Sequence, residues 1–322
     1  MITPAKSVRV AVLLGGVNSE REVSLVSGRR ILDALQSLGY NARPVVYEGH
    51  LAATVERLRA FELVFIALHG GEGEDGTLQS ALDEAGLRYT GSPSAASRLA
   101  MDKHSAKQRM LAAGIPTAPW VRLDSGNGPN VLGAAQAGAL TNFLSQQGYP
   151  VVVKPNGEGS TVGLTIVDDE AGLAPALSLA HEFDQQVLVE AYIPGRELTV
   201  TILDQRPLPI VEIEPEHQLY DYDCKYTAGM SAYTVPAQLP LKLAVAIQGA
   251  AQRLYAELDC RHYARVDLRL DPKDRFYCLE LNTLPGMTDH SLTPMAAAAA
   301  GMDFEALLDR IAQLALAESV PA

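Results

Sequence analysis

The sequence predicts an α/β protein in which an N-terminal domain with a parallel sheet precedes two α+β lobes. The first hundred residues alternate strand and helix signals, whereas the last two strands follow one another across a short turn. The chain has 322 residues, more than the roughly 100–150 that one domain usually holds. We therefore expect three units, covering residues 1–102, 103–190 and 191–322.

The first βα unit begins with an apolar run from Val8 to Leu14, which predicts a buried strand. Gly15-Gly16 then makes a turn. Ser19 and Glu22 have the spacing of a capping box, so we expect them to begin a helix that stops at Gly39.

A second unit of the same kind follows. Leu63 to Leu68 is apolar, residues 69–76 form a loop rich in glycine and acidic residues, and Thr77 to Ala85 is helical. Such alternation predicts a mostly parallel sheet with its ligand contacts at the carboxyl ends of the strands. His69 and the loop at residues 15–19 fall at these ends.

The central part of the chain begins with a helical pattern from about Ser94 to Ala113, ended by Gly114 and Pro116. Lys103 lies on the connection into this part. Further strands are expected at Val151–Lys154, Leu164–Val167, Val187–Glu190 and Glu197–Leu203, with a helix at Ala171–Phe183.

The final two strands, Tyr263 to Leu270 and Phe276 to Asn282, predict a hairpin. Because strand side chains alternate, Asp267 has Arg265 and Arg269 on its face, and Glu280 has Cys278 and Asn282 on its face. Symmetric pairing places Asp267 opposite Glu280 and Arg265 opposite Asn282. Two opposed carboxylates are destabilising alone, so we expect a cation between them.

Two carboxylates and an amide oxygen suit Mg²⁺ or Mn²⁺ rather than zinc. The metal set is therefore Asp267, Glu280 and Asn282, and Cys278 is expected to fill space on the same face. The alternative is a half-exposed strand with solvated charges.

Two loops have the composition of ligand-binding segments. Lys154 is followed by glycines through Gly163, which favours a flexible loop that closes over a triphosphate. It differs from the Walker loop and from the dinucleotide fingerprint in the order of its residues. The stretch Tyr220–Gly229 is aromatic and irregular, typical of an active-site lid. A plain glycine-rich hairpin and a tyrosine-rich surface loop are the alternatives.

Composition narrows the partners. The three cysteines share no CxxC spacing, which argues against a disulfide framework and a zinc knuckle. A formal net charge of −12 argues against nucleic acid and anionic membranes. The N-terminus does not resemble a signal peptide and no apolar run is long enough to span a bilayer. We therefore expect a cytoplasmic protein with no nucleic-acid or membrane partner.

In their order along nearly the whole chain, these motifs resemble the ATP-grasp superfamily and, within it, the D-alanine-D-alanine ligases of bacterial cell-wall synthesis. The resemblance implies an ATP-grasp fold, with the first D-alanine site in the N-terminal domain and a lid loop at about 217–232. The most similar segments are Leu14–Ser24, Ala67–Gly70, Gly73–Thr77, Met101–Lys103, Lys154–Gly163, Tyr220–Tyr222, Lys225–Tyr226, Arg265–Asp267 and Glu280–Thr288.

The resemblance implies ATP-dependent ligation of two D-alanine molecules for peptidoglycan precursors. One carboxylate attacks the γ-phosphate of ATP to give an acyl phosphate, and the second amine displaces phosphate through a tetrahedral intermediate. Because both steps develop charge on oxygen, positioning and electrostatic stabilisation dominate. Two Mg²⁺ or Mn²⁺ ions and a homodimer are implied as well.

Site residues carry over from the resemblance one by one. Phosphate contacts are implied for Lys103, Lys154 and Lys225, and two metal ions for Asp267, Glu280 and Asn282. The adenine and ribose pocket would hold Glu190, Ile193 and Glu197.

The substrate residues follow in the same way. Glu20 would bind the first ammonium and close the lid loop through Ser160 and Tyr226, with His69 near the first substrate. Arg265 and the Gly286 N–H would form the oxyanion hole, and Ser291 and Leu292 would bind the second carboxylate.

Two positions bear on specificity. Ala191 stands where many members have a lysine at the purine, and Tyr226 favours a dipeptide because D-alanine-D-lactate relatives tend to carry phenylalanine.

Three other functions are the alternatives: an ATP-grasp ligase for different amino or hydroxy acids, a nucleotide-dependent oxidoreductase, and a non-catalytic ATP sensor. The first βα unit lacks GxGxxG, which disfavours the oxidoreductase.

Overall fold

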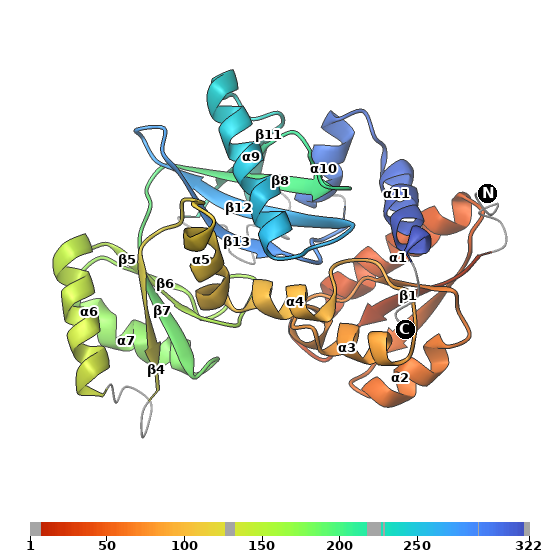
Figure 1. Cartoon of the computed structure of the whole chain (residues 1–322), viewed down its shortest axis with the longest axis horizontal. Helices are drawn as coiled ribbons and strands as arrows, with labels where there is room; N and C mark the ends of the chain where they lie inside the picture. Colours follow the sequence, from red (N-terminus) through yellow and green to blue (C-terminus); the bar gives the residue numbers. More distant parts are fainter. Residues whose placement is uncertain (1–7, 126–132, 218–226, 228, 289, 319–322) are drawn as a thin grey trace.

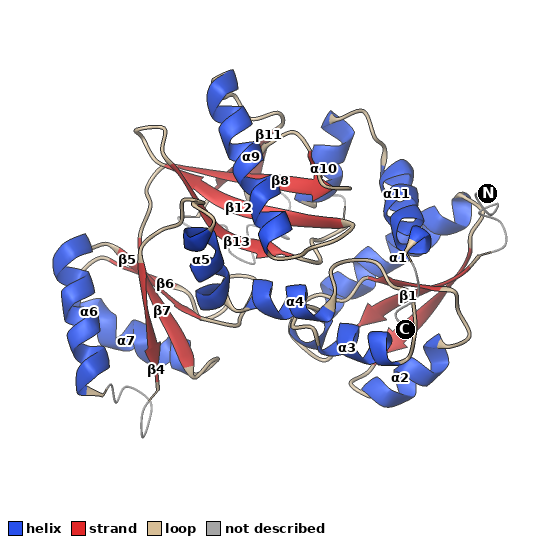
Figure 2. Ribbon diagram, viewed as in Figure 1, coloured by secondary structure: helices blue, strands red, loops and turns tan. Residues whose placement is uncertain are grey.

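Three sheets and the helices around them make up the computed structural model (Figure 1 and Figure 2), which describes residues 8–125, 133–217, 227, 229–288 and 290–318. Each sheet is built from its own stretch of the chain. Among the described helices, none combines the length and apolar character that crossing a bilayer requires.

The N-terminal sheet is parallel, as predicted, with the strand order β2-β1-β3. The carboxyl ends of β1 and β3 lie side by side at the pair Leu13 and Ile66, so the loops that carry Glu20 and His69 leave the sheet at one edge. Its elements are β1 (Arg9–Gly15), α1 (Arg21–Ser37), β2 (Asn41–Tyr47), α2 (Leu51–Leu58), β3 (Leu63–Ile66), a 3₁₀ turn (Gly71–Gly73) and α3 (Thr77–Glu84).

The start of α1 differs from the predicted capping box, which is wrong. Glu20 occupies the N-cap position without a capping side-chain bond, and the helix begins at Arg21. Asn18 orders this turn instead: its Oδ1 accepts from the Glu20 amide at 3.1 Å and its Nδ2 donates to the His69 carbonyl at 2.8 Å. The Glu20 carboxylate therefore remains available for a contact outside the helix.

The predicted helix from Ser94 to Ala113 is in fact two helices, α4 (Ser94–Met101) and α5 (Lys103–Ala112). Asp102 between them is extended, with φ −75° and ψ 95°, and its carboxylate caps α5 by accepting from the Ser105 amide at 2.8 Å. The side-chain cap explains the break, and it places Lys103 in the first turn of a new helix.

The four-stranded sheet is antiparallel and has the order β4-β7-β5-β6. Apolar side chains including Leu123, Val153 and Val189 give it a hydrophobic core of its own. The glycine-rich loop joins β5 to β6. The four-stranded sheet and its helices comprise β4 (Trp120–Asp124), α6 (Ala134–Gln147), β5 (Val151–Pro155), β6 (Thr165–Val167), α7 (Glu170–His181) and β7 (Gln186–Ala191).

The six-stranded sheet has the order β11-β10-β8-β12-β13, with β9 paired to β8. The last helix packs against α1 and β3, so the end of the chain returns to the N-terminal sheet (Figure 1). The six-stranded sheet and the helices of this part of the chain comprise β8 (Arg196–Leu203), β9 (Arg206–Pro207), β10 (Val211–Pro215), β11 (Ser231–Thr234), α9 (Leu241–Glu257), β12 (Tyr263–Leu270), β13 (Phe276–Asn282), α10 (Leu292–Ala299) and α11 (Phe304–Ala317).

The β12–β13 hairpin confirms the predicted register at the site: Asp267 pairs with Glu280 and Arg265 with Asn282. A bulge follows, because Leu268 pairs with Cys278 and leaves one extra residue on β13. Cys278 is consequently buried in the core, and the prediction that it shares the acidic face is wrong. Leu279 lies beside Glu280 at a cavity instead.

Candidate active site

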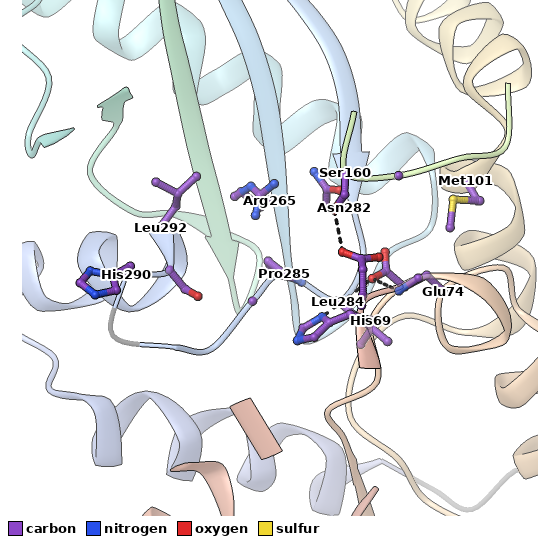
Figure 3. A pocket seen from close by; sticks show the side chains of 15 residues that line it. His69, Glu74, Met101, Ser160, Arg265, Asn282, Leu284, Pro285, His290 and Leu292 are labelled. Atoms are coloured by element: carbon purple, nitrogen blue, oxygen red, sulfur yellow. Dashed lines mark hydrogen bonds and ion pairs between the residues drawn. The ribbon is translucent and has the colours of Figure 1, made fainter. Parts of the chain in front are cut away.

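Two adjoining cavities lie between the sheets and share Gly159 and Ser160 of the glycine-rich loop. The first cavity, of about 660 Å³, takes its walls from all three sheets and their loops (Figure 3). The second, of about 920 Å³, lies between the four-stranded and six-stranded sheets. A ligand in one cavity would therefore meet a ligand in the other at Ser160.

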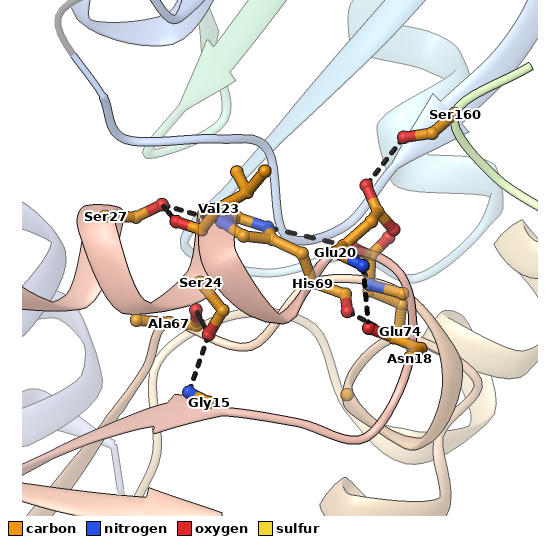
Figure 4. Close-up of polar contacts among 12 residues, drawn as sticks. Gly15, Asn18, Glu20, Val23, Ser24, Ser27, Ala67, His69, Glu74 and Ser160 are labelled. Atoms are coloured by element: carbon orange, nitrogen blue, oxygen red, sulfur yellow. Dashed lines mark hydrogen bonds and ion pairs between the residues drawn. The ribbon is translucent and has the colours of Figure 1, made fainter. Parts of the chain in front are cut away.

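Glu20 and Ser160 come together from opposite sides of the first cavity (Figure 4). The Ser160 hydroxyl donates to Glu20 Oε1 at 2.6 Å, although 140 residues separate the two. Ser160 and Thr161 have left-handed backbones, with φ of 50° and 66°, which non-glycine residues adopt at a cost of about 1–2 kcal/mol each. The bond to Glu20 helps to offset that cost. Tyr226, the third expected member, lies outside the described residues.

His69 is buried and lies against α1, beside Ser27 (Figure 4). Ser27 Oγ donates to the Val23 carbonyl at 2.7 Å and lies within hydrogen-bond distance of His69 Nε2, at 2.9 Å. Burial lowers the pKa of His69 more than the Glu20 carboxylate raises it. The ring is therefore neutral at pH 7.

Glu74 also lines the first cavity, and the sequence assigned it no role although it lies in the Gly/acid-rich loop. Burial, and then the Glu20 carboxylate, raise the pKa of Glu74 to about 8. Its Oε1 accepts from the Gly70 amide at 2.9 Å. The raised pKa keeps Glu74 largely protonated at pH 7.

The expected metal residues surround one carboxylate. Asp267 accepts two hydrogen bonds of 2.8 Å from Arg265, one from Asn282 Nδ2 at 2.9 Å and one from Thr199 at 2.8 Å. Glu280 Oε2 lies 3.4 Å from Lys103 Nζ. Arg265 and Lys103 thus supply the positive charge that the opposed carboxylates require.

These residues fit a hard divalent cation by their donor chemistry. In the described part of the chain, no three His, Cys, Asp or Glu side chains converge on one point. A metal between Asp267 and Glu280 would therefore take protein oxygens from two carboxylates and the Asn282 amide, and complete its shell with phosphate or water oxygens. That division is typical of Mg²⁺.

Gly286, Ser291 and Leu292 form another wall of the first cavity, with Leu292 labelled in Figure 3. A Cβ on Gly286 would lie 2.8 Å from Ser291 Oγ, so a side chain at this position would displace the Ser291 hydroxyl. Ser291 occupies the N-cap of α10 but turns its hydroxyl back to accept from the Thr288 amide at 2.8 Å. The N-terminus of α10 therefore keeps amides without a side-chain cap at the cavity.

The second cavity brings together the described residues expected at the nucleotide. Its walls include Lys103, Lys154, Glu190, Ile193 and Glu197, together with Asp267 and Glu280. Ala191 also borders it. Lys225 lies outside the described residues.

Lys107 and Arg269 are two cationic residues that the sequence reasoning missed. Arg269 holds the segment between β7 and β8: it donates to the carbonyls of Ile193 and Gly195 at 3.1 and 3.0 Å and pairs with Glu197 at 3.0 Å. Its place on the strand face of Asp267 was a usable signal. Lys107 lies 2.8 Å from Glu190, and its signal was the helical spacing of four residues from Lys103.

Family comparisons cover most of the chain. The family model described as D-ala D-ala ligase C-terminus matches residues 110–313, and the one described as D-ala D-ala ligase N-terminus matches residues 47–92. A D-alanine--D-alanine ligase from Marinobacter nauticus is 44% identical over 314 residues, which span 98% of this chain and 93% of the relative. One from Nitrosomonas europaea is 44% identical over 306 residues, spanning 95% and 96%.

Solved structures agree with the sequence comparisons. The D-alanine--D-alanine ligase from Bacillus anthracis complexed with ATP has 35% identity and a TM-score of 0.83, covering 96% of this chain and 97% of that chain. The VanG D-Ala:D-Ser ligase from Enterococcus faecalis has 28% identity and a TM-score of 0.79, covering 95% and 99%.

Proposed function

The chain belongs to the D-alanine–D-alanine ligase family, and from this premise we propose that it joins two D-alanine molecules at the expense of ATP through an acyl phosphate. The observation that carries the proposal is the meeting of two cavities at Ser160. One holds cations and carboxylates suited to a nucleotide, and the other holds Glu20 and Arg265 within reach of a small amino acid. The γ-phosphate and the attacking carboxylate can then meet at the shared wall.

In the second cavity, we assign the ATP phosphates to Lys103 and Lys154, and the base and ribose to Glu190, Ile193 and Glu197. Asp267, Glu280 and Asn282 would hold one or two Mg²⁺ or Mn²⁺ ions. A divalent ion held there would supply positive charge that stabilises the charge developing on oxygen during phosphoryl transfer. Arg265 donates two hydrogen bonds to the same Asp267 carboxylate. A metal ion bound to Asp267 would therefore compete with Arg265 for this carboxylate.

In the first cavity, Glu20 would bind the ammonium of the first D-alanine, because its carboxylate lines the cavity beside Ser160. Glu74, by contrast, stays largely protonated near pH 7. His69, neutral and tied to Ser27, adds no competing positive charge. A protonated Glu74 and a neutral His69 therefore add no charge of their own beside the substrate.

The second D-alanine would place its carboxylate at the N-terminus of α10, beside Ser291 and Leu292, where helix amides and the helix dipole favour an anion. Arg265 and the Gly286 amide would then stabilise the oxyanion of the tetrahedral intermediate. Lys225 and Tyr226, outside the described residues, would complete the phosphate site and the lid.

A substrate panel tests this function. Phosphate release from ATP is measured with D-alanine, D-serine, D-lactate, L-alanine or L-glutamate, and the product is identified by mass spectrometry. We expect D-alanyl-D-alanine as the product. Removing Mg²⁺ should abolish activity, and adding Mn²⁺ should restore it. D-serine is included because of the similarity to a D-Ala:D-Ser ligase. A preference for an L-amino acid would refute the proposal.

The biological setting is part of the same proposal. The product would serve peptidoglycan precursor synthesis in the cytoplasm, where its ATP is found. The homodimer stays a prediction, which sedimentation equilibrium of the purified protein tests directly.

A further inference from the structure

Lys107 is buried with no exposed surface, behind the second cavity rather than among its lining residues. It lies on α5 one turn after Lys103, so the two lysines share a helix face. Figure 1 shows α5 between the four-stranded and six-stranded sheets. Burying an ammonium is costly unless its partners compensate it, so the partners of Lys107 indicate its purpose.

The first partner is the buried carboxylate of Glu190. Lys107 Nζ lies 2.8 Å and Lys154 Nζ 3.2 Å from the same atom, Glu190 Oε2. Two ammonium groups therefore pair with the same carboxylate oxygen. Burial opposes the ionisation of Glu190, but the two lysines outweigh it and lower its pKa. Glu190 is therefore a carboxylate held by one oxygen.

The second partner is Thr117, which fixes Lys107 in place. Lys107 Nζ donates to Thr117 Oγ1 at 2.7 Å, and Thr117 donates its own proton to the Cys278 carbonyl at 2.7 Å. Cys278 lies on β13 next to the bulge and two residues before Glu280. The ammonium is thus fixed against the six-stranded sheet while it holds a residue of the four-stranded sheet.

We propose that Lys107 is a positioning residue for the purine subsite of the nucleotide site. By holding Glu190 Oε2, it leaves Oε1 to accept a hydrogen bond from the exocyclic amino group of a 6-aminopurine in the second cavity. A 6-oxopurine would set its carbonyl oxygen against the carboxylate and bind poorly. The inference rests on the proposed function in one respect, that the second cavity holds the nucleotide.

Lys107 has a second effect through Lys154. Lys107 balances the charge of Glu190 from a position behind the second cavity. Lys154, which lines that cavity, can therefore turn away from Glu190 toward phosphate. Without Lys107, Lys154 is the remaining lysine at Glu190. It would stay there, because a buried carboxylate left unpaired is strongly destabilising. Both effects weaken nucleotide binding and spare the first cavity.

The test measures binding of ADP and IDP by calorimetry to the full chain with Mg²⁺, in the wild type and in Lys107→Met. We expect the affinity for ADP to fall about tenfold, as for the loss of one charge-assisted hydrogen bond, and the preference for ADP over IDP to fall toward unity. The KM for D-alanine should stay within about twofold. Lys242→Met, an exposed lysine on α9, is the matched control.

A second comparison does not depend on the folding of Lys107→Met. Glu190→Gln and the double variant Lys107→Met/Glu190→Gln carry no unpaired buried carboxylate. We expect the double variant to bind ADP as tightly as Glu190→Gln binds it, and the same for IDP. A double variant more than about threefold weaker than Glu190→Gln would overturn the proposal. So would a folded Lys107→Met that retains the ADP over IDP preference of the wild type.

The two proposals fail separately. Absence of D-alanyl-D-alanine formation by the wild type refutes the ligase function, while the ADP and IDP affinities still decide the role of Lys107. Normal ligation with an unchanged base preference in Lys107→Met refutes only the positioning role.

Discussion

Glu280 lies across the hairpin from Asp267 and 3.4 Å from Lys103 Nζ. Glu280→Gln keeps the shape of the side chain and removes the charge that a divalent ion needs. We expect kcat to fall by about 10- to 100-fold and the Mg²⁺ concentration for half-maximal activity to rise, as for other weakened metal sites. Steady-state kinetics at varied Mg²⁺ measures both quantities.

The matched control for this change is Glu214→Gln, an exposed carboxylate on β10 of the same sheet. It should leave the Mg²⁺ dependence unchanged. Near-normal turnover of Glu280→Gln at limiting Mg²⁺ would contradict the role of Glu280 as a metal ligand.

Glu74 gives the folded protein a pH dependence of its own. Its pKa is raised from 4.5 to about 8, chiefly by burial, so between these values the folded state binds a proton that the unfolded state has released. The contribution of Glu74 to the free energy of unfolding therefore falls as pH rises through this window. Glu74→Gln should remove that loss, and the difference in stability between variant and wild type should grow from pH 5.5 to 8.5.

Urea unfolding at several pH values tests the sign of this effect. Glu22→Gln, an exposed change on α1, serves as the control and should follow the wild type. A constant difference between Glu74→Gln and the wild type across this range would show that Glu74 does not titrate there.

Residue-level prediction succeeded where strand parity applied and failed where a local event reset it. Asp267 and Glu280 face each other as symmetric pairing of the hairpin predicted, although the turn pairs Leu270 with Phe276 and the bulge makes up the one-residue difference. Cys278 changed faces because the bulge adds one residue, and nothing in the composition of the strand marks that insertion. Lys107 was missed because a lysine on a helix ordinarily indicates a solvated face.

The glycine-rich loop is the element on which both cavities depend. Ser160 ties it to Glu20, and at its base Asp184 Oδ2 accepts from the Gly157 amide at 2.8 Å. Ser160→Ala keeps the base and removes the contact with α1. We expect the KM for D-alanine to rise about 10- to 100-fold, the usual range for a lost hydrogen bond to a charged group, with Mg²⁺ dependence unchanged.

Initial-rate kinetics with D-alanine and Mg²⁺ varied in turn separates the two effects. Ser145→Ala, whose hydroxyl bonds only to its own helix at the Asn142 carbonyl in the described structure, is a matched control. If Ser160→Ala shifted the Mg²⁺ dependence and left the D-alanine KM unchanged, the loop would act on the metal rather than on closure.

Elements were predicted best where the hydrophobic period was long and unbroken. The parallel N-terminal sheet and the final hairpin were predicted from apolar runs and turn residues alone. The break between α4 and α5 was missed because Asp102 acts by capping Ser105, and an aspartate inside a helical pattern is compatible with a continuous helix. The start of α1 was misplaced because Asn18 bonds across to the His69 carbonyl, a contact that needs the tertiary fold.

The whole molecule is held by cores of different extent. Side chains of the N-terminal sheet share one core with Tyr263 on β12 and with α10 and α11, whereas the four-stranded sheet has a separate core around Val153 and Val189. A sheet with its own core can open without unfolding the rest. We expect amides of β5 and β7 to exchange hydrogen through an opening of lower free energy than those of β1 and β12.

Nucleotide binding should reduce this difference, because the second cavity takes Lys154 and Glu190 from the four-stranded sheet and Asp267 from the six-stranded one. A ligand that contacts both sheets binds only when they are closed, and it stabilises that state by mass action. In native-state hydrogen exchange followed by mass spectrometry, ADP with Mg²⁺ should slow exchange in β5, β7 and the loop between β5 and β6. D-alanine alone should leave β7 unchanged. Equal protection of β7 and β1 without ligand would contradict the separate core, and protection of β1 alone by ADP would place the nucleotide elsewhere.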